Sequence, residues 1–318
     1  MISDSPHQYR LQGASREVPA QVIENSIAQA QVTESRNLRA VLSLKHLAHQ
    51  TGCSYIYLRE IVQRVRDPYS TFSRRRRSGV RMRSISSPNP PLMAVQRWIL
   101  RNILNHVDPH PSSFAYQRNR SIVQCASRHI GADWLLKLDL FDYFPSISEE
   151  VVYWEFRRSG YSRLVAFELA RICTRPTNES PPIRSRSKYR AIPSYASAKE
   201  AGILPQGAPT SGAIANLVSR QLDISLTRLA NASGLTYTRY SDDLVFSGTG
   251  PLNRDTATQK IREIDNIISS CGFETHRKKT RIVTPGGSKD CSGPSSNSVR
   301  SPTASRVQAK DQDTHSRR

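Results

Sequence analysis

The stretch that decides the fold is Thr236-Tyr-Thr-Arg-Tyr-Ser-Asp-Asp-Leu-Val-Phe-Ser247. It contains two runs that favour β-strands around a short polar break, which predicts a β-hairpin. The adjacent carboxylates Asp242 and Asp243 would lie at its tip. Two neighbouring negative charges repel each other unless a cation neutralises them, and cations held by shared carboxylates serve in-line phosphoryl transfer. An ordinary solvated Asp-Asp turn would give the same local pattern.

A third carboxylate, Asp139, ends the run Trp134-Leu-Leu-Lys-Leu-Asp139, which has the apolar character of a buried strand. An acid in such a place is costly unless it binds a partner. Together with Asp242 and Asp243, it supplies the oxygen ligands that hard divalent cations prefer. Phe144, five residues after Asp139, is expected to lie beneath a sugar that occupies this site.

The composition predicts a polyanionic partner. The 318 residues include 46 Lys+Arg and 26 Asp+Glu, which gives a formal net charge of +20. A charge of this size indicates nucleic acid or an anionic membrane surface. No apolar stretch has the length of a membrane span, and the N-terminus lacks a signal-peptide pattern. We therefore expect a cytoplasmic protein that binds nucleic acid and has no membrane partner.

A basic segment over 73–88 predicts a second β-hairpin, with a glycine in its turn. Its tip carries arginines that are expected to bind nucleic acid: Arg74, Arg75, Arg76 and Arg77. Arg81 and Arg83 are two residues apart and so share one face of a strand. Because a guanidinium group binds phosphate in a bidentate manner, this pair suits a triphosphate or a backbone phosphate. The alternative is a solvated basic face.

Helical patterns surround these strands. Residues 38–50 and 55–65 predict two helices joined by a glycine turn, which is either a helix-turn-helix or a plain helical hairpin packed on the next domain. A Pro/Gly turn leads into a predicted helix over 213–230, whose N-terminal amides suit phosphate. Residues 255–271 predict an amphipathic helix, and residues 273–283 predict a basic strand.

Five segments, taken in order, resemble the motifs of bacterial reverse transcriptases, most closely those of the retron type. Gly79-Val-Arg-Met-Arg-Ser-Ile is similar to the fingers motif, and Leu138-Asp-Leu-Phe-Asp-Tyr-Phe-Pro-Ser-Ile to the first aspartate strand. Leu204-Pro-Gln-Gly-Ala-Pro-Thr-Ser resembles the Gln-Gly turn, and Tyr240-Ser-Asp-Asp243 the Tyr-x-Asp-Asp box. Lys278-Lys-Thr-Arg-Ile is similar to the late lysine strand. Each motif alone is weak, and their common order makes the resemblance specific.

This resemblance implies an α+β fold of the right-hand polymerase type, with an antiparallel palm sheet and helical fingers. It also sets the expected domain boundaries along the chain. They are a weakly ordered N-terminal arm or a partly helical lead-in over 1–37, a helical segment over 38–72, fingers over 73–138, a palm over 139–285 with a fingers insertion near 176–198, and a disordered Ser/Arg-rich tail over 286–318 in place of the thumb.

The resemblance further implies a role for each site residue. Asp139, Asp242 and Asp243 would hold two Mg²⁺ ions for nucleotidyl transfer. The residues implied to bind the incoming nucleotide are Arg83 with Arg81 in reserve, Gln206, and Phe144 as a steric gate against the 2′-OH. Lys279 is implied to contact the phosphates of the primer or the nucleotide.

For a retron enzyme, the implied activity is RNA-directed DNA polymerase. Such an enzyme copies a structured non-coding RNA with dNTPs, beginning at a 2′-OH of that RNA, and yields a branched RNA–DNA product (msDNA). An effector protein and a function in phage defence are implied with it. Two alternatives remain open: a bacterial reverse transcriptase of another class, and a truncated, inactive RNA-binding remnant.

The sequence also departs from the family pattern. Gly212 follows Ser211 where the family commonly has proline, and Ser241 stands where alanine or valine is more usual. No Asn-Ala-x-x-His segment lies between the first aspartate strand and the Gln-Gly turn. The tail over 288–318 contains no Leu, Ile or Phe and so cannot form a packed thumb. Our interpretation is a change of reading frame near Gly287, from a frameshift or a sequencing error.

Overall fold

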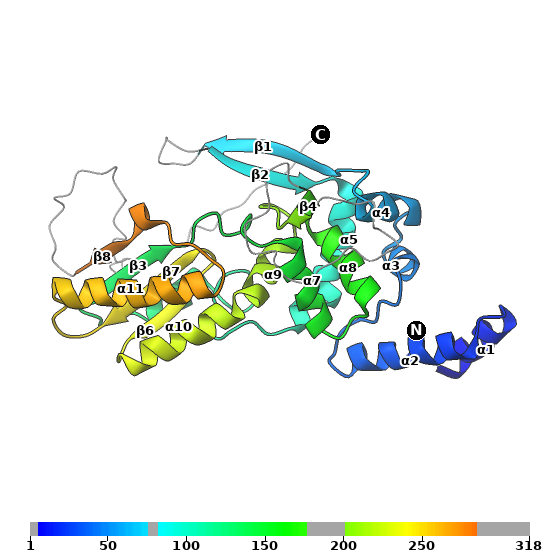
Figure 1. Ribbon diagram of the computed structural model, residues 1–318, viewed down its shortest axis with the longest axis horizontal. Helices are drawn as coiled ribbons and strands as arrows, with labels where there is room; N and C mark the ends of the chain where they lie inside the picture. Colours follow the sequence, from blue (N-terminus) through cyan, green and yellow to red (C-terminus); the bar gives the residue numbers. More distant parts are fainter. Residues whose placement is uncertain (1–5, 76–81, 177–200, 285–318) are drawn as a thin grey trace, which may run out of the picture. The chain divides into compact units, whose positions relative to one another are not determined.

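The computed structural model describes residues 6–75, 82–176 and 201–284, and its central feature is a four-stranded antiparallel sheet (Figure 1). The strand order is β6-β7-β3-β8, so a hairpin lies beside a strand from earlier in the chain. The strands are β3 (Trp134–Asp139), β6 (Thr236–Tyr240), β7 (Asp243–Gly248) and β8 (Arg281–Val283). The predicted hairpin and the predicted buried strand are both confirmed.

Apolar side chains at alternate strand positions join the sheet to two helices. Leu136 of β3 lies opposite Phe246 of β7, and both side chains are buried. The helices are α10 (Arg220–Ala232), which contacts β6, and α11 (Arg254–Ser270), which contacts α10. The apolar cluster around Leu136 also includes buried residues of these two helices: Leu222, Leu226, Ile264 and Ile268. One core therefore extends from the sheet into the helices.

A layer of helices forms the rest of the core. α8 is almost fully enclosed, because every residue from Val165 to Cys173 is buried. It packs against α4, α5 and α7. The helices of this layer are α3 (Leu44–Thr51), α4 (Tyr55–Val62), α5 (Pro90–Asn102), α7 (Glu149–Arg158), α8 (Arg163–Cys173) and α9 (Ser211–Val218). The described part of the chain is thus α+β, with antiparallel sheets.

The helices α3 and α4 are separated where the sequence predicted a break, but α3 begins at Leu44 rather than at 38, and α4 ends at Val62 rather than at 65. Gly52 follows α3, and the hydroxyl of Ser54 accepts a hydrogen bond from the amide of Tyr57 at the start of α4. Leu47 and Leu58 are buried in the common core. Because α4 packs on α8 and α3 on α5, this pair has the packing of a helical hairpin on neighbouring helices.

Two smaller hairpins flank the helices. β1 (Tyr69–Arg75) pairs with β2 (Met82–Pro88), and Figure 1 shows them as a long hairpin along the top of the view. β4 (Arg175–Pro176) pairs with β5 (Gly202–Ile203), so the chain departs and returns at one point. The basic insertion expected near 176–198 falls between these two strands, outside the described residues.

The N-terminal segment, expected over 1–37 as a weakly ordered arm or a partly helical lead-in, is largely helical where the structure describes it. It contains α1 (Pro6–Ser15) and α2 (Ala20–Glu34). The apolar residues Ile23, Ile27 and Ala30 of α2 recur at helical spacing and are buried. The small number of these residues made the pattern weak in the sequence.

Two further expectations need correction. The helix expected over 213–230 is two helices, α9 and α10, which meet at Ser219. The basic strand expected over 273–283 contains the 3₁₀ turn η3 (Arg277–Lys279), and only β8 is extended strand. The remaining short elements are η1 (Leu104–His106) and α6 (Ile122–Ser127).

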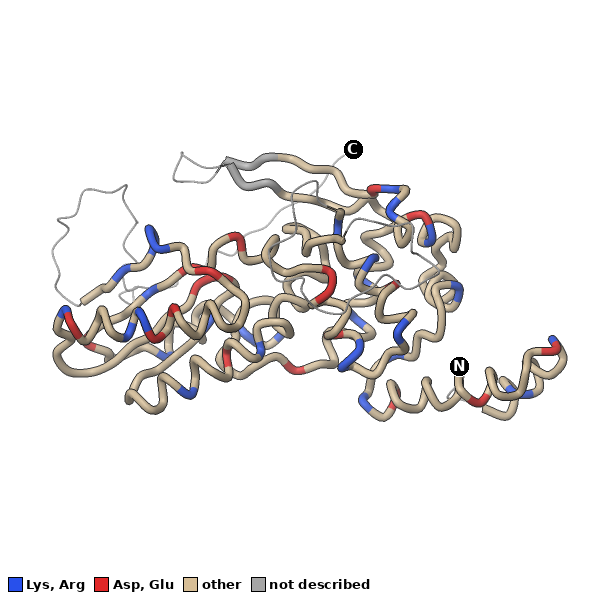
Figure 2. Tube along the Cα trace, in the orientation of Figure 1, with Lys and Arg blue, Asp and Glu red and all other residues tan. Residues whose placement is uncertain are grey.

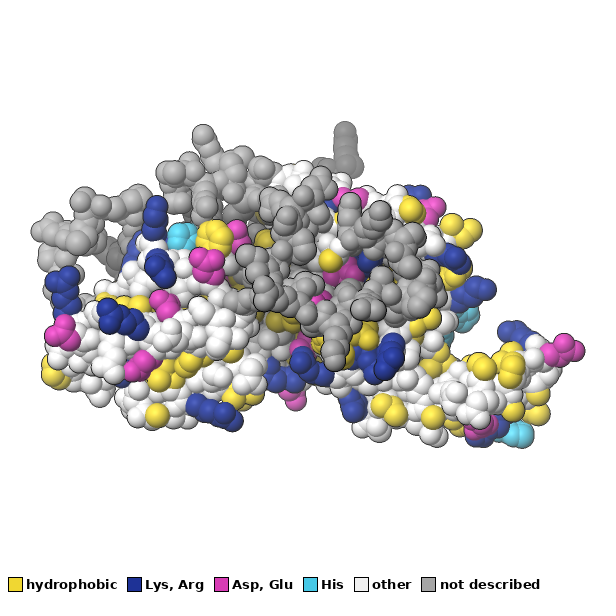
Figure 3. All heavy atoms as spheres, viewed as in Figure 1, with side chains coloured by type: hydrophobic (Ala, Val, Ile, Leu, Met, Phe, Trp, Pro, Cys, Tyr) yellow, Lys and Arg dark blue, Asp and Glu magenta, His cyan; other side chains and the backbone are white. Residues whose placement is uncertain are grey.

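Charged side chains are spread widely over the described elements. Figure 2 shows Lys and Arg on helices and strands throughout, with Asp and Glu between them. Figure 3 shows basic side chains standing over both the sheet and the helices on this face. Across residues 6–75, 82–176 and 201–284, we find no helix with the length and apolar character needed to cross a membrane.

We predict that removing the buried carboxylate of Glu149 strongly destabilises the fold. It accepts hydrogen bonds from Arg171 at 2.7 Å, from the amide of Gly202 at 2.8 Å, and from Arg64, and it has no exposed surface. Glu149→Ala leaves two buried arginines without their partner, so the free energy of unfolding should fall by about 3–5 kcal/mol in chemical denaturation. Glu60→Ala, which removes a pair with Arg66 at the surface, should cost at most about 1 kcal/mol. Equal losses in the two variants would contradict this prediction.

Candidate active site

Strand register brings three aspartates to one end of the sheet. Asp139, the last residue of β3, lies opposite Asp243, the first residue of β7. Asp243 also pairs with Tyr240 of β6, so Ser241 and Asp242 form a two-residue loop between the strands. The antiparallel pairing therefore holds the three aspartates at the same end of neighbouring strands.

The loop has a constrained conformation. Ser241 has a φ of 60°, which is in the left-handed region used at the first position of tight hairpin turns. Its hydroxyl lies 2.8 Å from the phenol oxygen of Tyr116. The amide of Leu140 donates to the carbonyl oxygen of Asp242 at 2.9 Å, which ties the loop to the end of β3. These bonds fix the backbone that carries the aspartates.

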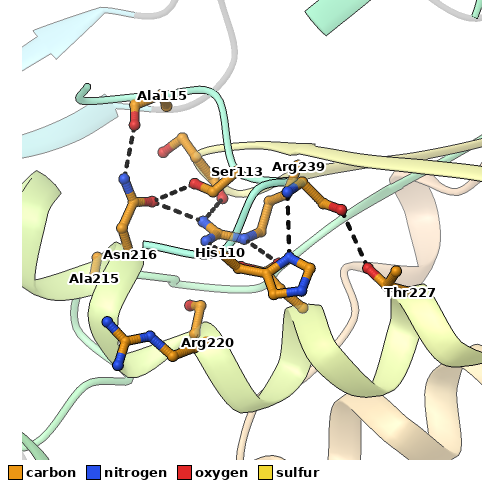
Figure 4. A network of polar contacts seen from close by, with 12 residues as sticks. His110, Ser113, Ala115, Ala215, Asn216, Arg220, Thr227 and Arg239 are labelled. Carbon is orange, nitrogen blue, oxygen red and sulfur yellow. Dashed lines mark hydrogen bonds and ion pairs between the residues drawn. The ribbon is translucent and has the colours of Figure 1, made fainter. Parts of the chain in front are cut away.

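A buried ion pair anchors this hairpin. Arg239 of β6 and Asp223 of α10 have no exposed side-chain surface, and the guanidinium donates to both carboxylate oxygens at 2.8 and 2.7 Å. It donates to the carbonyl oxygen of Ser241 at 3.1 Å. It also donates to the hydroxyl of Tyr143 at 2.9 Å and to the amide oxygen of Asn216 at 3.1 Å. Figure 4 shows Arg239 and Asn216 within this network.

Sequence reasoning missed this network. Its signal is a charged residue at a position whose neighbours predict burial. Arg239 stands between buried strand residues, and Asp223 follows the buried Leu222 in α10. Read one at a time, either residue is indistinguishable from a surface charge.

Lys279 neutralises one of the aspartates. Its ammonium group lies 2.6 Å from both carboxylate oxygens of Asp139, whose exposed fraction is 8%. The amide of His276 donates to the carbonyl oxygen of Asp139 at 2.7 Å, so η3 is held against the end of β3. Lys279 and Asp139 thus form a partly buried ion pair.

The donor set has the chemistry of a site for hard cations, because three carboxylates supply oxygen ligands only. Among the residues that the structure describes, however, no three His, Cys, Asp or Glu side chains are gathered as a ready metal site. The ion pair of Lys279 with Asp139 gives a physical reason, since an ammonium group already satisfies that carboxylate. A cation bound to Asp139 would compete with Lys279.

The surroundings of Asp243 raise the pKa of its carboxyl group. Desolvation by its surroundings, followed by the negative charges of Asp242 and Asp139, raises its pKa from 3.8 to about 6. The positive charges of Lys279 and Lys137 oppose this rise. Because the side chain of Asp243 is exposed, solvent weakens the desolvation, and repulsion from the neighbouring carboxylates remains to raise its pKa.

A cavity of about 890 Å³ adjoins the hairpin. Phe144 and Gln206, both predicted to bind the nucleotide, line it together with Tyr116. Arg97 and Arg101 of α5 add positive charge to its wall. Tyr116 links this cavity to the aspartate hairpin, because the same side chain hydrogen-bonds to the loop between β6 and β7.

The Gln-Gly turn forms one wall of this cavity through close contact with β2. The amide of Ser86 donates to the carbonyl oxygen of Gln206 at 2.7 Å. Gly207 has a φ of 119°, and a Cβ atom there would lie 2.8 Å from Cγ2 of Ile85 and 3.0 Å from the carbonyl oxygen of Ser86. Only glycine fits this approach.

Three of the predicted arginines, Arg74, Arg75 and Arg83, stand on strands whose backbone the structure describes. Arg74 of β1 pairs with Arg83 of β2 in the backbone register, and Arg75 with Met82. The side chains of these arginines are not described, and Arg76, Arg77 and Arg81 lie outside the described residues. The roles of all six therefore stay predictions.

The sequence matches the family described as reverse transcriptase (RNA-dependent DNA polymerase) over residues 75–309. The chain belongs to the reverse transcriptase family. The match continues into the tail expected over 286–318, and that tail lies outside the described residues.

The relatives of this chain include several retron reverse transcriptases. It is 35% identical to the retron Ec86 reverse transcriptase of Escherichia coli over 214 residues, which are 67% of this chain and 58% of that protein. It is 36% identical to the retron Mx162 reverse transcriptase of Myxococcus xanthus over 211 residues, which are 64% of this chain and 42% of that one. For the retron Mx65 reverse transcriptase of the same organism, identity is 35% over 232 residues, with shares of 73% and 51%. The chain spans about half the length of these curated relatives.

We predict that the pKa of Asp243 lies above its ordinary value of 3.8, toward about 6, in metal-free buffer. Carboxyl NMR should show this titration, and Asp242→Asn should lower the pKa because it removes a neighbouring negative charge. A matched control, Asp255→Asn on the exposed surface of α11, should leave the pKa unchanged. A pKa of Asp243 at or below its ordinary value would contradict the crowding described above.

The raised pKa of Asp243 also makes the stability of the fold depend on pH. Because the folded pKa lies above the unfolded one, the folded protein binds more protons between pH 3.8 and about 6. The free energy of unfolding therefore falls as the pH rises through this window. Asp243→Asn should be more stable than the parent above pH 6, and its advantage should fade below about pH 4.

Proposed function

We propose that this reverse transcriptase is an RNA-directed DNA polymerase of the retron type, with a right-hand fold in which the four-stranded sheet is the palm. The observation that supports the proposal most directly is the register of Asp139, Asp242 and Asp243 at one end of the sheet. These are the carboxylates of the two aspartate motifs in the resemblance. Their link through Tyr116 to a cavity that contains Phe144 and Gln206 adds a place for a nucleotide.

Two Mg²⁺ ions are proposed to bind Asp139, Asp242 and Asp243. When bound, they would lower the pKa of the primer hydroxyl and neutralise the leaving pyrophosphate. The elevated pKa of Asp243 fits such a site, because a cation relieves the repulsion that raises it. Lys279 would exchange Asp139 for the phosphates of the primer or the nucleotide, which keeps an anionic partner on its ammonium group.

The residues of the cavity are proposed to select and orient the nucleotide. The ring of Phe144 packs against Tyr116 and Tyr143, at centroid distances of 6.0 and 5.4 Å. A ring held in this way would exclude a ribose 2′-OH and so favour dNTPs. Gln206, whose backbone carbonyl oxygen accepts a hydrogen bond from Ser86, would support the nucleotide or the template.

The basic residues outside the cavity have proposed partners of their own. Arg83, with Arg81 in reserve, would contact the triphosphate. The arginines at the tip of the β1–β2 hairpin would contact nucleic acid: Arg74, Arg75, Arg76 and Arg77. The net charge of +20 supports a polyanionic partner for the chain as a whole.

The wider proposal is a cytoplasmic retron enzyme that copies a structured non-coding RNA into branched RNA–DNA, acts with an effector protein and serves phage defence. The retron names of its relatives support the retron class in this proposal. The alternatives are another class of bacterial reverse transcriptase and an inactive RNA-binding remnant. Incorporation of dNTPs would exclude the remnant. A neighbouring gene for a non-coding RNA would favour the retron over the other classes.

We predict that Asp242→Asn abolishes dNTP incorporation on an RNA template with an annealed DNA primer in Mg²⁺. Loss of a metal-binding carboxylate should lower the rate by at least about 100-fold, the scale of removing one electrostatic contact to a transition state. Asp255→Asn in α11, an equal loss of charge at an exposed position, should keep full activity. Activity that survives Asp242→Asn, or none in the parent protein, would overturn the proposed function.

A second prediction concerns the choice of sugar. Phe144→Ala should lower the preference for dNTP over rNTP by about tenfold or more, because it removes the ring that would exclude the 2′-OH. The ratio of kcat/KM for dATP and ATP measures this preference. Phe72→Ala, which removes a half-exposed ring of β1 that does not line the cavity, is the matched control. An unchanged ratio in Phe144→Ala would assign the selection to another residue.

A further inference from the structure

Ser241 and Gly212 meet at one side chain. Ser241 stands in the aspartate loop, and Gly212 follows Ser211 after the Gln-Gly turn. The Ser241 hydroxyl lies 2.8 Å from the phenol oxygen of Tyr116. A Cβ atom on Gly212 would lie 2.4 Å from Cγ of the same tyrosine. The ring of Tyr116 thus occupies space that any larger residue at position 212 would fill.

Hydrogen bonds fix the backbone before Tyr116. The backbone amide of Phe114 donates to the carbonyl oxygen of Arg239 at 2.9 Å. The backbone amide of Arg239 donates to the carbonyl oxygen of Ser112 at 2.7 Å. The side-chain amide of Asn216 donates to the carbonyl oxygen of Ala115 at 2.7 Å, a contact visible in Figure 4. These bonds tie the segment to β6 and to α9.

The conformation of Tyr116 itself is unusual. Its φ is 59°, in the left-handed region that bulky residues seldom adopt. The two residues joined by the phenol–hydroxyl contact, Tyr116 and Ser241, therefore both have positive φ. Backbone strain of this kind persists only where surrounding contacts hold it, and it concentrates at functional sites.

The ring faces the cavity as well as the loop. Tyr116 lines the cavity with Phe144 and Gln206. Its ring meets that of Phe144 edge to face, with centroids 6.0 Å apart and planes at 66°. A single residue thus contacts the loop that carries Asp242 and the ring that would select the sugar.

We propose that Tyr116 is a positioning residue with two separable actions: its hydroxyl holds the Ser241 turn, and its ring supports Phe144 against the nucleotide. Gly212 provides the space in which that ring sits. The proposal rests on the proposed polymerase function. It adds a residue from outside the aspartate motifs, and it gives a common physical reason for Gly212 and Ser241.

The hydroxyl is tested by Tyr116→Phe, which keeps the ring. Loss of one hydrogen bond at the turn should lower kcat about fivefold, with the KM for dNTP and the preference for dNTP over rNTP unchanged. Ser241→Ala should have the same effect, and the double variant should be no slower than either single one. Additive losses in kcat would show that the two groups act independently and would overturn this part of the proposal.

The ring is tested by Tyr116→Ala. Without edge-on support, Phe144 should discriminate less, so the preference for dNTP over rNTP should fall about tenfold, whereas Tyr116→Phe retains it. An Ala variant that discriminates like the parent protein would contradict the supporting role of the ring.

The contact between the Tyr116 ring and Gly212 is tested by thermal stability, without an assay of activity. Gly212→Ala should lower the Tm because the new methyl group collides with the tyrosine ring, and it should lower it much less in a Tyr116→Ala background. Equal losses in both backgrounds would refute the contact. If the parent protein incorporates no dNTP, the proposed function fails. If it is active and the Tyr116 variants match it in kcat and sugar preference, only the present inference fails.

Discussion

The ion pair between Arg239 and Asp223 is the constraint on which the candidate site depends. Both groups are completely enclosed, and two opposite charges in such surroundings are tolerated only when further hydrogen bonds complete their coordination. Here Tyr143, Asn216 and the Ser241 carbonyl oxygen provide them. The guanidinium thereby joins β6, α9, α10 and the segment after β3 at one point. The position of the aspartate loop follows from that junction.

This arrangement explains how the protein tolerates three carboxylates at one end of a sheet. Repulsion between them opposes folding, and it appears as the raised pKa of Asp243. Lys279 offsets it locally, and the Arg239 network holds the backbone of the loop in place from the interior. Contacts outside the three carboxylates thus offset the repulsion between them. Such compensation is usual where function requires like charges to lie close together.

The sequence was informative where the pattern of apolar residues is local. The strand that ends at Asp139, the hairpin around Asp242, and the helix after Asn253 all have strong periodicity, and the structure contains each of them. The break at Ser219 was not predictable, because apolar spacing continues through it. The contacts of Tyr116, Arg239 and Lys279 were also hidden, since each joins segments far apart in the chain. Periodicity reports which face of an element is buried, and not what a polar group on that face will meet.

The short pairing of β4 with β5 has a consequence for the length of the segment between them. Pro176 lies opposite Gly202, and the amide of Gly202 is bound by the enclosed Glu149, so both ends of the intervening segment are fixed by the core. For a loop with fixed ends, each doubling of length costs only about 0.6 kcal/mol of closure entropy. A change in the length of the chain between these two strands therefore costs little closure entropy. The pairing of β4 with β5 is thus a point at which the fold can accept a longer or a shorter segment.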